Sequence, residues 1–329
     1  MPTPQPQTIP SKPSNRTRPM KILTLLTAAL AIGSLGLGSA AAAALKAAVT
    51  FKGRDTAETW FVVKASTESV SLSASPTGAG ARDVAASSIE SIAFEQPEGW
   101  DEALAEYDRR NFKAAAQRFG TIADALAGIA GYRDSFGARA RYLQMESLRQ
   151  VGDFDGIAAA MKTVKRSPIA LGDAFQTQLK LYDAWAAAGD KDWNNLLRMV
   201  SAYEAEKPGG DANPSAPPFQ DQAAGEFVQL VYLRGLARAG LGSADEALND
   251  FYRAATLNFG VEQSVAALAT LEALEILKAR ATAEKPDPYA QKEGHSLAVA
   301  YRDRFGNGEF PEGFGLFEKA PAKPEEPEA

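Results

Sequence analysis

The stretch Val231–Leu257, VYLRGLARAGLGSADEALNDFYRAATL, decides how the chain folds because it reads as a complete helical hairpin. Its first helix is predicted to end near Ala239, and Gly240 and Gly242 supply the turn that reverses the chain. The second helix follows directly. A single hairpin cannot bury its own apolar face, so this stretch predicts further hairpins packed on either side of it.

Small residues and one aromatic set the spacing of this hairpin. Gly235 on the first helix and Ala247 on the second allow close approach of the two backbones, and Phe251 fills the space one turn further on. Ala254 completes the same face, at i, i+4 and i+7 from Ala247. These four positions resemble the tetratricopeptide repeat (TPR), which implies an α-helical solenoid that binds other proteins.

Three upstream stretches carry the same frame of apolar positions. The first copy has Ala103, Phe112, Ala115, Phe119 and Ile122. The second copy has Met145, Phe154, Ile157, Met161 and Val164. The third copy has Ala184, Trp193, Leu196, Val200 and Tyr203. The period is about forty residues rather than the thirty-four of the TPR family, and Ile157 and Leu196 stand where that family prefers alanine. We therefore predict a mostly α fold, with TPR-like hairpins over residues 97–308 that include two capping helices after Leu257.

A different pattern precedes the repeats. Residues 46–96 alternate polar and apolar side chains in five short runs, VTF, WFVVKA, SVSLSAS, ARDVAA and SIAF. The inward-facing residues are predicted to be Val49, Phe51, Trp60, Val62, Val70, Leu72, Ile92 and Phe94. Five such strands bury an apolar face by curling into a small β-barrel-like domain. The run ending in SSIESIAF resembles the end of an SH3-like or Sm-like barrel, which implies a spacer or docking module.

The first 45 residues are interpreted as a targeting segment, in which a disordered n-region rich in Pro, Thr, Ser and Gln precedes a signal peptide. Met20 and Lys21 lead into an apolar core from Ile22 to Leu37, followed by small residues with A-x-A cleavage options. This pattern predicts export to the periplasm or cell envelope, with translation starting at Met1 or at Met20. The alternative is an uncleaved transmembrane anchor, because the uncharged run reaching Leu45 is just long enough to span a bilayer. At the other end, residues 309–329 are predicted to form a disordered acidic Pro-rich tail, with Phe310, Phe314 and Phe317 available to attach its first part to the helices.

The charge balance disfavours a nucleic-acid partner. The net charge is −6, and removal of Lys12, Arg16, Arg18 and Lys21 with the targeting segment changes it to −10. Phosphate binding relies on a basic surface, so RNA binding through the barrel is a minor alternative. The chain contains no cysteine and one histidine, which disfavours disulfides and transition-metal sites, and no cofactor is predicted.

Two stretches that look like a catalytic or a cofactor-binding motif lack the residue arrangement that these motifs require. GHSLA, starting at Gly294, is close to the nucleophile elbow of serine hydrolases, but His295 adjoins Ser296 and no second histidine exists to act as the base. Gly240 and Gly242 follow a helix, whereas a dinucleotide fingerprint follows a strand. The sequence therefore predicts a non-enzymatic protein.

Function is then expected from a surface. In TPR arrays the first helix of each pair lines a concave groove that holds a peptide or a partner's helix. The frame places six candidates for partner binding on that face: Tyr107, Tyr142, Glu146, Arg149, Trp185 and Tyr232. The prediction is a protein-interaction scaffold of the bacterial cell envelope. The alternative is an envelope hydrolase whose carboxylates converge in the helical array and cleave glycans.

Overall fold

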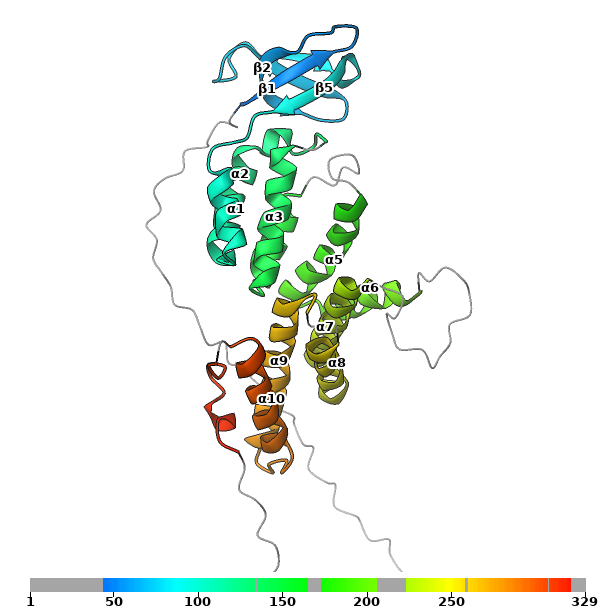
Figure 1. Cartoon of the computed structure of the whole chain (residues 1–329). Helices are drawn as coiled ribbons and strands as arrows, with labels where there is room; N and C mark the ends of the chain where they lie inside the picture. The colour runs from blue at the N-terminus through cyan, green and yellow to red at the C-terminus, as the bar shows by residue number, and fades with distance from the viewer. Residues whose placement is uncertain are drawn as a thin grey trace, which may run out of the picture. The chain divides into compact units, whose positions relative to one another are not determined.

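A computed structural model describes residues 44–133, 135–164, 173–205, 223–257, 260–306 and 308–320. Figure 1 colours the elements by their position along the chain. Residues 1–43 of the predicted targeting segment and the part of the predicted tail beyond residue 320 lie outside these ranges, whereas Leu45, predicted to end the targeting segment, belongs to the first strand of the sheet. Within them, no helix is both long and apolar enough to cross a bilayer.

The N-terminal part is a five-stranded antiparallel sheet, as the alternation predicts. Its strands are β1 (Leu45–Phe51), β2 (Glu58–Ala65), β3 (Ser69–Ser73), β4 (Arg82–Ala85) and β5 (Ile89–Phe94). They pair in the order β4-β3-β2-β1-β5, and a 3-10 turn, η1 (Ala86–Ser88), joins the two edge strands. The first strand is longer than the predicted VTF because the alternation extends upstream, and Leu45 and Ala47 are buried together with Val49.

The sheet shares its hydrophobic core with the first helices. Val49, Val62 and Val70 belong to the same cluster of buried residues as Phe119 and Ile129. An edge-to-face contact between the rings of Phe94 and Tyr132, with centroids 6.0 Å apart, adds to this junction. The sheet and the helices that follow it therefore stabilise one another.

The remaining elements form five successive helix pairs. The helices are α1 (Trp100–Asp108), α2 (Phe112–Ala125), α3 (Phe136–Gln150), α4 (Phe154–Met161), α5 (Asp173–Gly189), α6 (Trp193–Ala205), α7 (Ala224–Gly240), α8 (Ala244–Thr256), α9 (Gln263–Ala281) and α10 (Ala290–Arg304), with 3-10 turns η2 (Ala127–Ile129) and η3 (Gly315–Phe317). Each helix contacts the next one along the chain, and α3 contacts α5, α5 contacts α7 and α7 contacts α9. The coarse prediction of a mostly helical protein preceded by a five-stranded sheet is confirmed.

The apolar positions shared by the four repeat copies account for the packing within these helix pairs. Ala103, Ile157, Leu196 and Ala247 are fully buried, as the frame requires. A Cβ atom placed on Gly235 would lie 2.6 Å from Cε1 of Phe251, so glycine allows the close approach of α7 and α8.

Glycines with positive φ angles and a capping side chain mark the helix boundaries that the sequence predicts. Gly152 and Gly242 adopt φ angles of +69° and +87°, which L side chains rarely adopt. The Asp153 side chain then caps α4 by accepting a hydrogen bond from the Gly156 amide at 2.8 Å.

The first part of the predicted tail is folded onto the helices through its aromatic residues. Phe314 and Phe317 are buried, and a Cβ atom on Gly294 would overlap the Phe317 ring. His295 Nδ1 lies 2.8 Å from the Phe317 carbonyl oxygen. Residues 309–320 therefore pack on α10 instead of belonging to the tail, because these aromatic rings bury apolar surface there.

Candidate functional site

The six residues predicted to bind a partner lie on the first helices of the first four pairs. Tyr107 is on α1, Tyr142 and its neighbours Glu146 and Arg149 are on α3, Trp185 is on α5 and Tyr232 is on α7. Only the two residues nearest the N-terminus, Tyr107 and Tyr142, are partly exposed. The other four are buried, with exposures of 0% to 9%.

Trp185 and Tyr232 are parts of an aromatic stack inside the helical array. Their ring centroids are 5.6 Å apart, and the Phe154 ring lies 5.3 Å from Trp185 and 6.4 Å from Tyr232. Both side chains are 0% exposed. Their expected place in an open groove is therefore corrected: they join α4, α5 and α7, and they cannot touch a partner in this conformation.

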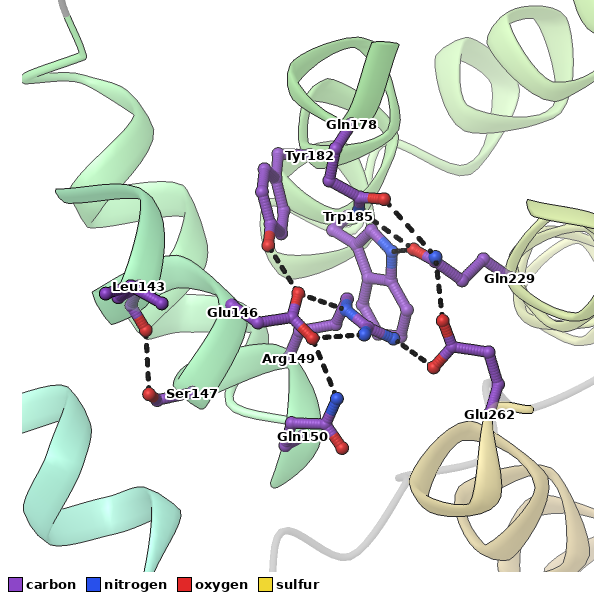
Figure 2. A network of polar contacts seen from close by, with 10 residues as sticks. All are labelled: Leu143, Glu146, Ser147, Arg149, Gln150, Gln178, Tyr182, Trp185, Gln229 and Glu262. Atoms are coloured by element: carbon purple, nitrogen blue, oxygen red, sulfur yellow. Dashed lines mark hydrogen bonds and ion pairs between the residues drawn. The ribbon is translucent and has the colours of Figure 1, made fainter. Parts of the chain in front are cut away.

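Arg149 lies at the centre of a polar cluster on the same face (Figure 2). Its Nε donates a hydrogen bond to Glu146 Oε2 at 2.9 Å, and its Nη2 donates to the other oxygen of the same carboxylate. Its Nη1 donates to Glu262 Oε2 at 2.9 Å. One guanidinium thus binds two carboxylates that come from distant parts of the chain.

A second layer of polar side chains completes this arrangement. Tyr182 Oη donates to Glu146 Oε2 at 2.7 Å, and Gln150 Nε2 donates to Glu146 Oε1 at 2.8 Å. Gln229 Oε1 accepts from Trp185 Nε1 at 3.1 Å, and Gln229 Nε2 donates to Glu262 Oε1 at 3.4 Å. We call these residues, together with Gln178, the Arg149 cluster: Glu146, Arg149, Gln150, Gln178, Tyr182, Trp185, Gln229 and Glu262.

The two carboxylates have pKa values shifted in opposite directions. Burial raises the pKa of Glu146, but the charge and hydrogen bonds of Arg149 outweigh burial and leave that pKa below its usual value. Burial dominates at Glu262, whose pKa is raised although Arg149 lowers it. With two acids and one arginine, the cluster carries an excess negative charge when both acids are ionised.

The charges of the Arg149 cluster also shift the pKa values of the two partly exposed tyrosines, Tyr107 and Tyr142. Burial, followed by the negative charge of Glu146, raises the pKa of Tyr107 to about 12 and that of Tyr142 to about 12. Glu262 raises both values as well. Both phenols are therefore neutral at ordinary pH and present hydroxyl groups beside a charged cluster.

Five members of the cluster were not among the predicted residues, namely Gln150, Gln178, Tyr182, Gln229 and Glu262, and helical spacing could have indicated two of them. Tyr182 and Gln229 lie three positions before Trp185 and Tyr232, so helical spacing places them on the same faces. Glu262 had no comparable signal, because it precedes a helix that the sequence assigns to a cap.

A second buried ion pair joins the two helices of the best-matching hairpin. Arg234 Nε donates to Asp250 Oδ2 at 3.0 Å, and Arg238 Nη1 donates to the same oxygen at 2.7 Å. Arg234 and Asp250 are both buried. These contacts hold α7 against α8 and are structural.

The residues of the GHSLA motif are used structurally. Ser296 Oγ donates to the Lys292 carbonyl oxygen at 3.1 Å, within α10, and His295 contacts the Phe317 carbonyl. Across the part of the chain that the structure describes, no group of three or more acidic, histidine or cysteine side chains is placed to hold a metal ion.

A hollow lies elsewhere, between α8 and α10. It has a volume of about 500 Å³ and is lined by Tyr252, Tyr289, Lys292, Glu293, Ser296, Leu297 and Ala300. Tyr252 Oη donates to Glu293 at 3.2 Å, whereas Tyr289 is 71% exposed. Tyr289 is thus an exposed tyrosine away from the Arg149 cluster, and it serves as a control residue for Tyr107.

Comparison with known proteins gives no family for this chain. No protein-family model matches it, and searches of curated proteins and of solved structures find no match.

Proposed function

We propose that this chain is a non-enzymatic protein-interaction scaffold of a bacterial cell envelope. Its partner, a peptide or a helix, would bind on the face formed by the first helices of successive pairs, beginning at Tyr107 and Tyr142. One observation supports this proposal above all: of the six residues that the repeat frame assigns to a binding face, Glu146, Arg149 and Trp185 belong to the Arg149 cluster, and the pKa values of Tyr107 and Tyr142 are shifted by its charges.

The repeat identity and the location belong to the same proposal. Burial of all four small or aliphatic frame positions, Ala103, Ile157, Leu196 and Ala247, supports TPR-like repeats. The strand order, with both edges joined through η1, supports a small barrel before them. Export, with or without a retained anchor, rests on the apolar segment after Met20.

Site-specific photocrosslinking tests where the partner binds. A photoreactive phenylalanine analogue replaces Tyr107 in one variant and Tyr289, an exposed tyrosine on a different surface, in a matched control. We expect a defined adduct from position 107 in intact envelopes, and binding of the purified adduct partner to be weakened by Tyr107→Ala. Adducts that are the same from both positions, or that form only at 289, would reject the face proposed here.

The alternative function is glycan hydrolysis by two carboxylates. Glu146 and Glu262 favour it in one respect, because their pKa values are displaced in opposite directions, as those of a catalytic acid and base are. Their shared contact with Arg149 favours a structural role. Activity of the purified chain on cell-wall glycan that disappears in both Glu146→Gln and Glu262→Gln, and persists in Glu284→Gln, would establish the hydrolase.

A further inference from the structure

The Arg149 cluster joins two ends of the helical array that are far apart in sequence. Glu262, the residue just before α9, binds Arg149 near the end of α3 across 113 positions. Beside this contact, Arg110 Nη1 donates to Gln263 Oε1 at 3.4 Å, across 153 positions. Both contacts bring the start of α9 to the ends of the first helices α1 and α3.

Polar side chains make most of this connection. Arg149, Glu262 and Gln229 meet through hydrogen bonds, and Arg110 and Gln263 are exposed. Apolar side chains also lie near this connection: a Cβ on Gly152 would lie 2.9 Å from a methyl carbon of Leu268, which packs against the hydrophobic core. Neither α1 with α9 nor α3 with α9 is among the helix pairs with extensive backbone proximity.

Such a connection is energetically different from the contacts between consecutive helices. A buried ion pair has a small net effect on stability, because the cost of removing both charges from water offsets their attraction. Consecutive helices are held by apolar packing, as between Gly235 and Phe251, which is lost only when the hairpin itself separates. The link between α3 and α9 is thus held by less helix-to-helix packing than the contacts between consecutive helices.

We propose that the contact between Arg149 and Glu262 is a clasp. The helical array opens and closes between α3 and the start of α9, and opening exposes the face that carries Tyr107, Tyr142, Glu146 and Arg149. In the closed form, Glu262 binds Arg149 on this face, and Gln229 in turn binds Glu262. The role of opening in partner binding rests on the proposed function, whereas the opening itself is measurable without any partner.

The absence of cysteine from the chain allows a clean measurement of opening. Spin labels are attached to Arg109→Cys and Val261→Cys, and their separation is measured by electron paramagnetic resonance. The Arg109 side chain is 73% exposed and Val261 is 61% exposed, and neither belongs to the Arg149 cluster. The labels therefore report on the gap between the end of α1 and the start of α9 without entering the cluster.

We expect Glu262→Ala to raise the ratio of long to short label separations by about fivefold or more, a change that corresponds to the loss of one modest interaction. Glu262→Gln keeps the shape and a hydrogen-bond acceptor, so its rise should be smaller. The matched control is Asp245→Ala, which removes an exposed ion pair between α8 and Arg280 at the far end of α9 and should leave the distribution unchanged.

Two results would overturn the clasp. The first is a label distribution in Glu262→Ala that is identical to that of the unsubstituted chain. The second is loss of cooperative thermal unfolding in both Glu262→Ala and Glu262→Gln, which would make the contact a structural part of the fold. Opening without any partner adduct at position 107 would reject the proposed function and leave the clasp intact.

Discussion

Arg149 binds Glu146, three positions earlier on α3, and Glu262, 113 positions later, through different nitrogens of one guanidinium. The first carboxylate belongs to the same helix, whereas the second comes from the residue just before α9, which follows the first four helix pairs in the chain. This relationship turns a charged stripe on one helix into a buried cluster. Its energetic consequences are open to direct measurement.

Removing the arginine should be costly. Arg149→Met leaves the carboxylates of Glu146 and Glu262 buried without their cation, so we expect the free energy of unfolding to fall by about 3–5 kcal/mol. Urea denaturation measures it. The control, Arg280→Met, breaks an ion pair with the exposed Asp245 and should cost at most about 1 kcal/mol. Equal losses in the two variants would contradict the central role of Arg149.

Stability should fall as pH rises through neutrality because of one acid on α9. Burial, aided by the negative charge of Glu275, raises the pKa of Glu272 to about 7. A raised pKa in the folded state means that the stabilisation is complete below pH 4.5 and is lost as the pH passes 7. Replacement by Gln, in Glu272→Gln, should flatten the dependence of unfolding free energy on pH between 5 and 8 by up to about 3 kcal/mol. The exposed Glu284→Gln serves as the comparison, and parallel pH profiles for all three proteins would refute the effect.

One buried hydroxyl should be dispensable. Tyr232 Oη is buried and has no hydrogen-bond partner among the described residues. Tyr232→Phe therefore removes an uncompensated polar atom and should raise the unfolding free energy by about 1 kcal/mol. Tyr182→Phe is the matched change, because that hydroxyl donates to Glu146 at 2.7 Å, and it should lower the free energy by about 1–2 kcal/mol. A stability loss in both variants would show that Tyr232 Oη is satisfied in solution.

The best-matching hairpin should tolerate no side chain at its closest approach. Gly235→Ala drives a methyl group into the Phe251 ring, which is fully buried, and we expect a loss of about 1–3 kcal/mol despite the higher helix propensity of alanine. Gly260→Ala meets no atom within 4 Å and should be close to neutral. Thermal unfolding of the two variants measures this difference in stability. Equal melting temperatures would mean that α7 and α8 pack less tightly than the structure shows.

Periodicity alone predicts which face of each helix is buried, as Ile157 and Leu196 illustrate. It cannot predict whether the face carrying Arg149 stays open, because that depends on small rotations between hairpins that accumulate over more than a hundred residues. A Glu146–Arg149 pair at i, i+3 looks like a solvated helix surface until Glu262 reaches it. The same limit applies to the sheet: alternation predicts its strands, but not that they share a core with Phe119.

The core shared by the sheet and the first helices determines which fragments of the chain can fold by themselves. A fragment starting at Trp100 would leave Phe119 and Ile129 without the valines that cover them and should aggregate, although its repeats would be intact in sequence. Trimming that begins at Leu45 keeps both sides of the junction. The smallest unit that could be transplanted or crystallised therefore spans the strands and the first hairpins together.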